Sequence, residues 1–172
     1  MTSLSYLDKF DKTGINKYIN NYRQMLKENP EDGELNCAMG ICYLDLCLYD
    51  LAAQYFGKAI EQIPDHSDVY YYYAIALLKG KRPKVLSLTE IRKIEEYLGA
   101  AIQIDDSKSK CYYLWALIKH DFYIKNGLRI IPPSFEDLIN KANGVPYDKN
   151  EIEMMLQRVP ISDQNLINFV RR

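Results

Sequence analysis

The chain has 172 residues, of which 48% are hydrophobic and 26% are charged. This length suits one compact domain or a short repeat array, and this apolar content can bury a core, which excludes general disorder. Lysine and arginine number 22 against 23 aspartates and glutamates, so the net charge is -1. Because no excess positive charge attracts a phosphate backbone, we expect no nucleic-acid partner.

The sequence shows no targeting or membrane segment. The N-terminal residues Met1 to Asp11 include Asp8 and Lys9 and lack a long apolar core, so they are not expected to be a secretion signal. The longest apolar stretches, such as Tyr70 to Leu78, are less than half as long as the roughly 20 residues that cross a bilayer. We therefore expect a soluble, cytoplasmic protein with no membrane contact.

The cysteines and histidines do not form a metal or disulfide pattern. Cys37, Cys42 and Cys47 recur every five residues, a spacing that spreads them around a helix. The only histidines, His66 and His120, are far apart in the sequence. We expect buried thiols that pack as small hydrophobic groups, with no metal and no cofactor.

Helical periodicity dominates from Tyr18 onward, and no run alternates as a strand would, which predicts an all-α fold. A first helix is expected within Ile15 to Asn29. Apolar residues at three- and four-residue spacings then predict two helices, Asp32 to Leu48 and Leu51 to Ile63, joined by a short turn around Tyr49-Asp50. Pro64 ends the second helix, since its ring cannot continue an interior turn.

Small and large residues alternate in this hairpin in a way that amphipathicity does not require. Gly40 stands one helical turn from Tyr43, and small residues let two helices approach while an aromatic ring fills the space between them. The hairpin resembles the tetratricopeptide repeat, whose pattern over about 34 residues is matched by Met39, Gly40, Tyr43, Ala52, Phe56, Ala59 and Pro64.

The neighbouring segments are degenerate copies of this unit. A second repeat has apolar positions in Tyr70 to Leu77 and Ile94 to Ala101, separated by a long loop from Lys79 to Leu88. A third has them in Tyr112 to Ala116 and Phe135 to Ala142, with Ser134 as the expected N-cap. The expected organisation is an array over residues 1–146, with a partial repeat at about 13–32, the strongest repeat at 33–66 and degenerate repeats at about 67–106 and 109–146.

The C-terminal residues 147–172 are predicted to cap the array. Asp148 and Glu151 read as a capping box for one helix. A final short helix, Asp163 to Val170, has Ser162 as its expected cap. An array exposes a hydrophobic end unless something covers it, so a helical cap is the expected role of this tail.

The resemblance implies a right-handed superhelix in which the first helix of each repeat lines a concave groove. It places ten mostly apolar and aromatic residues at groove-facing positions, as a hypothetical peptide-binding site: Cys37, Ile41, Leu44, Tyr71, Tyr72, Ile75, Leu78, Lys110, Tyr113 and Leu117. The family's best understood ligand chemistry is a clamp of lysine, asparagine and arginine for a terminal carboxylate. Only Lys110 fits that clamp, because Cys37, Ile41, Tyr72 and Leu114 stand at the other places.

The expected function is protein–protein interaction, as an adaptor, scaffold or chaperone-like holder of an apolar or aromatic segment, with no catalytic residue. Two alternatives stay open: a structural module whose groove is filled by its own tail, and a chaperone similar to those of type III secretion. An enzyme would need converging titratable groups, which the sequence does not show. Assembly into a homo-oligomer also stays open. The chaperones' usual N-terminal dimerisation helix is not evident before Thr13. The basic stretch Lys79 to Lys84 is interpreted as a solvated loop, with contact to an acidic partner as the alternative.

Overall fold

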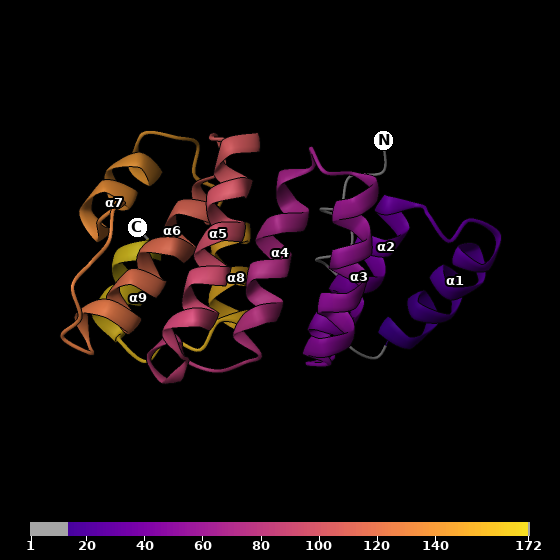
Figure 1. Cartoon of the computed structure of the whole chain (residues 1–172), viewed down its shortest axis with the longest axis horizontal. Coiled ribbons are helices and arrows are strands. Elements are labelled where there is room, and N and C mark those ends of the chain that lie inside the picture. Colours follow the sequence, from indigo (N-terminus) through magenta and orange to yellow (C-terminus); the bar gives the residue numbers. More distant parts are fainter. Residues whose placement is uncertain (1–13, 172) are drawn as a thin grey trace. The chain divides into compact units, whose positions relative to one another are not determined.

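A computed structural model of the chain describes residues 14–171 (Figure 1). These residues form helices and turns without a strand, so the all-α prediction is confirmed. The expectations for Met1 to Asp11, and for a repeat or dimerisation helix near Thr13, lie outside the described residues. None of the helices between residues 14 and 171 has the length and apolar content that crossing a bilayer demands.

The chain divides into two compact units at the Lys79–Gly80 bond. Unit 1 holds four helices in its described part: α1 (Ile15–Glu28), α2 (Gly33–Asp45), α3 (Tyr49–Gln62) and α4 (Ser67–Leu78). Consecutive helices contact one another, and α2 and α3 form the most extensive contact as an antiparallel hairpin (Figure 1).

The close approach predicted within the α2–α3 hairpin is present. A Cβ atom added to Gly40 would lie 2.5 Å from the Phe56 ring, nearer than real Cβ atoms approach other heavy atoms. Phe56 and Ala59 are fully buried, as the repeat pattern requires. Gly40 therefore allows the Phe56 ring to fill the space between the two helices.

The turn between α2 and α3 lies earlier than predicted. It occupies Leu46 to Leu48, and helix α3 already begins at Tyr49, where the sequence suggested the turn itself. The reason is a Schellman motif without glycine: the Leu48 amide donates to the Tyr43 carbonyl at 2.9 Å, and Cys47 takes a left-handed conformation with φ 59°. No glycine or asparagine marks this stop in the sequence.

Unit 2 contains the remaining elements. They are the 3-10 turn η2 (Pro83–Val85), α5 (Leu88–Ile104), α6 (Ser109–Ile118), the π-helical turn η3 (Lys119–Ile124), α7 (Phe135–Asn143), α8 (Lys149–Arg158) and α9 (Gln164–Arg171). Helix α6 contacts α5, α7 and α8, so it is the centre of this unit (Figure 1).

Capping side chains fix most helix starts in unit 2. Ser134 forms a capping box with Asp137, which confirms the predicted N-cap of α7. Asp148 accepts bonds from the first amides of α8, but Glu151 does not complete the predicted box because its carboxylate binds a lysine on α6. Helix α9 is capped by Asp163, whose carboxylate accepts from the Leu166 amide at 3.2 Å, and not by Ser162.

The Gly40–Phe56 contact predicts opposite effects for two glycine substitutions. Gly40→Ala should lower the free energy of unfolding by about 1–3 kcal/mol, because the added methyl group collides with a buried ring. Gly57→Ala in α3 is the matched control, since nothing lies within 4 Å of its added Cβ. It should raise stability by about 0.5–1 kcal/mol through helix propensity. Urea denaturation measures both, and a neutral Gly40→Ala would contradict the close approach.

The left-handed Cys47 predicts a stabilising substitution. Cys47→Gly should raise the free energy of unfolding by about 0.5–1 kcal/mol relative to Cys47→Ala, since glycine alone adopts positive φ without steric cost. The alanine variant is the control because both substitutions remove the thiol that binds Tyr49. Thermal denaturation of the two variants provides the comparison. Equal melting temperatures would show that the turn carries no such strain.

Candidate functional site

The ten residues predicted to line a groove are all buried. Seven lie on α2 and α4 in unit 1, three lie on α6 in unit 2, and none exposes more than 3% of its surface. Within unit 1, Tyr72 stacks on Phe56 with ring centroids 6.1 Å apart, and Tyr71 packs edge-on against Tyr72. In this conformation these side chains are not accessible to a partner. That they line a peptide groove stays a prediction, and on α6 it requires the tail to move.

The C-terminal tail contacts two of the three predicted groove positions of α6. Lys110 is 3% exposed at its side chain, and its ammonium group lies 2.7 Å from a carboxylate oxygen of Glu151 on α8. The Tyr113 ring meets Tyr147, which lies just before α8, at a centroid distance of 6.2 Å and an angle of 86°. The Tyr113 hydroxyl also contacts the Asn143 side-chain oxygen at 3.1 Å. Two of the three α6 groove positions thus contact the chain's own C-terminal segment.

Polar contacts also hold the tail together and attach it to unit 2. The Arg171 guanidinium binds both oxygens of Glu153 at 2.9 and 3.0 Å, which ties α9 to α8. The Tyr147 hydroxyl lies 3.0 Å from the carbonyl oxygen of Val170. The Lys125 ammonium lies 3.3 Å from the carboxylate of Asp163, which caps α9. Helix α8 therefore contacts α6, and α9 is tied to α8 and to Lys125.

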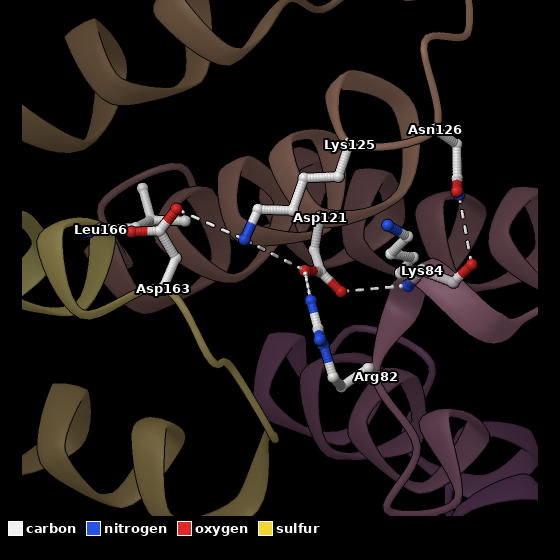
Figure 2. A network of polar contacts seen from close by, with 7 residues as sticks. All are labelled: Arg82, Lys84, Asp121, Lys125, Asn126, Asp163 and Leu166. Atoms are coloured by element: carbon white, nitrogen blue, oxygen red, sulfur yellow. Dashed lines mark hydrogen bonds and ion pairs between the residues drawn. The ribbon is translucent and has the colours of Figure 1, made fainter.

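A buried aspartate organises the loop before α5 (Figure 2). Asp121 in the π-helical turn is 1% exposed, and one of its oxygens accepts from the Arg82 guanidinium at 2.6 Å. Its second oxygen accepts from the backbone amide of Lys84 at 3.0 Å. Lys125 lies 3.8 Å from the first oxygen. Part of the basic stretch interpreted as a solvated loop is therefore an anchored segment.

A second buried cluster anchors the loop after the π-helical turn. The Lys119 ammonium, 1% exposed, lies 2.7 Å from Glu95 and donates to the Ile131 carbonyl at 2.8 Å. It also lies 4.6 Å from the centre of the Tyr123 ring, within cation–π range. Trp115 donates to the same carboxylate oxygen of Glu95 at 3.0 Å. The cluster joins α5, α6, the π-helical turn and the loop.

Two buried side chains have pKa values shifted toward their neutral forms. Burial and the neighbouring Glu95 raise the pKa of Tyr123 to about 12. Burial, with the nearby Asp45 charge, raises the pKa of Cys42 to about 11, so its thiol stays protonated and a poor nucleophile at neutral pH. Among residues 14–171, histidine, cysteine and carboxylate side chains do not gather in groups of three that could bind a metal ion.

An open pocket lies where helices α6 and α8 begin. Its lining residues come from the two helix starts and the segments before them: Ser107, Lys108, Ser109, Pro146, Tyr147, Asp148, Lys149 and Glu151. Lysines and carboxylates are mixed here, and Asp148 already accepts bonds from the first amides of α8. The pocket therefore offers no concentrated charge of one sign.

The two buried polar clusters were missed by the sequence interpretation. A signal for them exists, because Lys119 and Asp121 interrupt an apolar helical run that extends from Leu114 to Ile124. Charged residues at positions that a helix buries need partners, and this need predicts long-range ion pairs. Their partners Arg82 and Glu95 lie more than twenty residues away, so helical spacing does not identify them.

The ion pair between the tail and α6 predicts a stability effect. Glu151→Ala should lower the free energy of unfolding by about 1–3 kcal/mol, because it leaves the buried Lys110 ammonium without this carboxylate. The double substitution Lys110→Met, Glu151→Ala should recover most of that loss. Glu153→Ala on the same helix is the control, with an expected change within about 0.5 kcal/mol. Equal losses for Glu151→Ala and Glu153→Ala would contradict the special role of the α6 contact.

Comparisons with known proteins inform the fold. No protein-family model matches the sequence, and no curated protein matches it. Among solved structures, the chain is similar to the crystal structure of MamA with a TM-score of 0.55, at 20% sequence identity over 86% of this chain and 70% of that chain. MamA is tetratricopeptide-like, so this similarity supports a tetratricopeptide-like helical fold here, and at this identity it shows the fold alone.

Proposed function

We propose that the chain is a divergent tetratricopeptide protein that serves as a protein-interaction or scaffold module. The proposal is supported by the MamA-like fold and by the repeat residues of the α2–α3 hairpin, with Gly40 against Phe56. Helical repeat proteins commonly present extended surfaces to other polypeptides. Fold similarity alone would be an analogy, so the proposal also depends on which surfaces are free.

The proposal has two forms, a groove that receives a partner segment and a groove that the tail covers, and one observation supports the second. The groove positions Lys110 and Tyr113 on α6 contact Glu151 and Tyr147 of the tail. The tail thus contacts part of the α6 surface that is predicted to face a partner segment. We infer that α8 and α9 are a built-in cover, and that partners bind the module outside the α6 face.

The alternative is a partner segment that displaces the tail and contacts the groove residues. Charge reversal on α8 separates the two possibilities. Glu151→Lys places a second cation opposite the buried Lys110 and should release α8, which faster amide hydrogen exchange in residues 149–158 would show. Glu153→Lys is the matched control, since that residue pairs with Arg171 within the tail.

The two variants and the unaltered chain should be used as baits in an extract of the cells that produce the protein. We expect all three to capture the same proteins in equal amounts, because the binding surface lies outside the α6 face. Capture that increases several-fold only for Glu151→Lys would instead favour the displaced tail. If no bait captures a protein above the level of empty beads, the interaction function itself is contradicted.

A further inference from the structure

The exposed apolar side chains of the chain are not spread evenly. Ten large hydrophobic residues in the described part are strongly exposed, and half of them lie in two short segments of unit 2, residues 85–88 and 124–131. These five are Val85, Leu88, Ile124, Leu128 and Ile131, exposed by 68%, 41%, 43%, 45% and 44%. Scattered apolar residues are ordinary on a surface, whereas a cluster marks an interaction site.

The segments that carry these residues lie side by side. The turn η2 contacts the π-helical turn η3, and the Asn126 side chain donates to the Lys84 carbonyl at 3.1 Å (Figure 2). The Leu128 amide donates to the Tyr123 carbonyl at 2.8 Å, which brings Leu128 back toward the π-helical turn. We call the exposed side chains of residues 81–88 and 124–131 the loop surface.

Buried side chains of the π-helical turn fix the backbone of the loop surface. Asp121 binds Arg82 and the Lys84 amide on one side, and Lys119 binds the Ile131 carbonyl on the other. Loops are usually the mobile parts of a fold. Because these contacts order the loops before any partner arrives, less conformational entropy is lost on binding.

The loop surface is mainly basic, with the Glu90 carboxylate at its edge, where it accepts from the Ser87 amide and hydroxyl at 2.8 and 2.7 Å. Residues 81–88 and 124–131 contain five lysines and arginines and no aspartate or glutamate. Arg82 and Lys125 pair with Asp121. The side chains of Lys81, Lys84 and Arg129 are exposed, and no ion pair joins them to any residue between 14 and 171. Three exposed cations thus lie in the same two segments as the five exposed aliphatic side chains, in a chain whose net charge is -1.

We propose that the loop surface binds an acidic, amphipathic segment of a partner protein, with aliphatic contacts to Val85 and Leu128 and ion pairs to Lys84 and Arg129. Apolar contact supplies affinity at the centre of such an interface, and complementary charge steers and orients the partner. The proposal rests on the interaction function above and names its surface and the chemistry of its partner.

An anionic membrane surface is the main competing ligand for basic and apolar loops. The loop surface lacks the tryptophan and tyrosine side chains that anchor proteins at a membrane interface. Three cations contribute on the order of 1 kcal/mol each at an anionic membrane, which is weak without a long amphipathic helix or a lipid anchor. The composition therefore favours a protein segment.

The test uses the full chain, labelled with ¹⁵N, and a synthetic helical peptide of about 16 residues with leucines on one face and glutamates elsewhere. Two control peptides replace the leucines with serines or the glutamates with lysines. We expect saturable binding of the first peptide, with chemical-shift changes at the amides of residues 81–88 and 124–131. Each control peptide should bind at least tenfold more weakly, and added salt should weaken the first peptide.

Two surface variants then identify the contacts. One variant combines Val85→Ser with Leu128→Ser, and the other combines Lys84→Glu with Arg129→Glu. Each variant should weaken peptide binding at least tenfold without changing the melting temperature. Leu51→Ser is the matched control: this leucine is 39% exposed but lies in unit 1, so the variant should bind as the unaltered chain does.

Several results would overturn this proposal. They are the absence of saturable binding, shift changes confined to other residues, or unchanged affinity in both surface variants. Another ligand at the loop surface would also overturn the proposal. In that case the peptide would not bind, and the serine variant would abolish binding to phosphatidylserine vesicles or self-association in sedimentation. If the bait experiment captures partners and these tests fail, the loop surface is not the binding site and the proposed interaction function stands. If both fail, the function is wrong as well.

Discussion

The buried carboxylate of Asp121 is the constraint that shapes unit 2. An ionised carboxylate is stable away from water only when hydrogen bonds and opposite charges replace its hydration. Arg82 and the Lys84 amide supply them from a segment thirty-seven to thirty-nine residues earlier in the chain. Lys125, which reaches Asp121 at 3.8 Å, also contacts Asp163 at the start of α9. One aspartate therefore links the loop before α5, the π-helical turn and the C-terminal tail.

Features that depend on neighbours in the sequence were predictable. The helices of the α2–α3 hairpin, the contact of Gly40 with Phe56 and the Ser134 cap follow from helical spacing and from local hydrogen-bond chemistry. The same reasoning placed the turn after α2 too late, because Cys47 takes a left-handed conformation that no glycine or asparagine at this position indicates. The contacts of the candidate site were harder to predict from the sequence. The partners of Lys119, Asp121 and Lys110 are fixed by tertiary packing and lie 24 to 41 residues away.

Burial also changes what the predicted groove residues mean. Apolar and aromatic positions on the first helix of a repeat suit a ligand groove and a packed interior equally well, because both demand the same side chains. The sequence left two roles open for the tail, a cap at the end of the array or a segment that fills the groove. The contacts of Lys110 and Tyr113 favour a tail that covers part of α6. The exposed residues Val85 and Leu128 are more informative, since several aliphatic side chains exposed on two contacting loop segments are not explained by packing.

Competition with the tail favours a binding surface outside α6. A segment tethered by a short linker acts at an effective concentration on the order of millimolar. A free partner present at micromolar concentration would need an affinity for the α6 face roughly a thousandfold higher than that of the tail to displace it. The tail already provides a carboxylate for the buried Lys110 and an aromatic ring for Tyr113, so such an advantage is hard to obtain. The loop surface carries no such penalty, because its apolar side chains and three cations are already exposed and its backbone is already ordered.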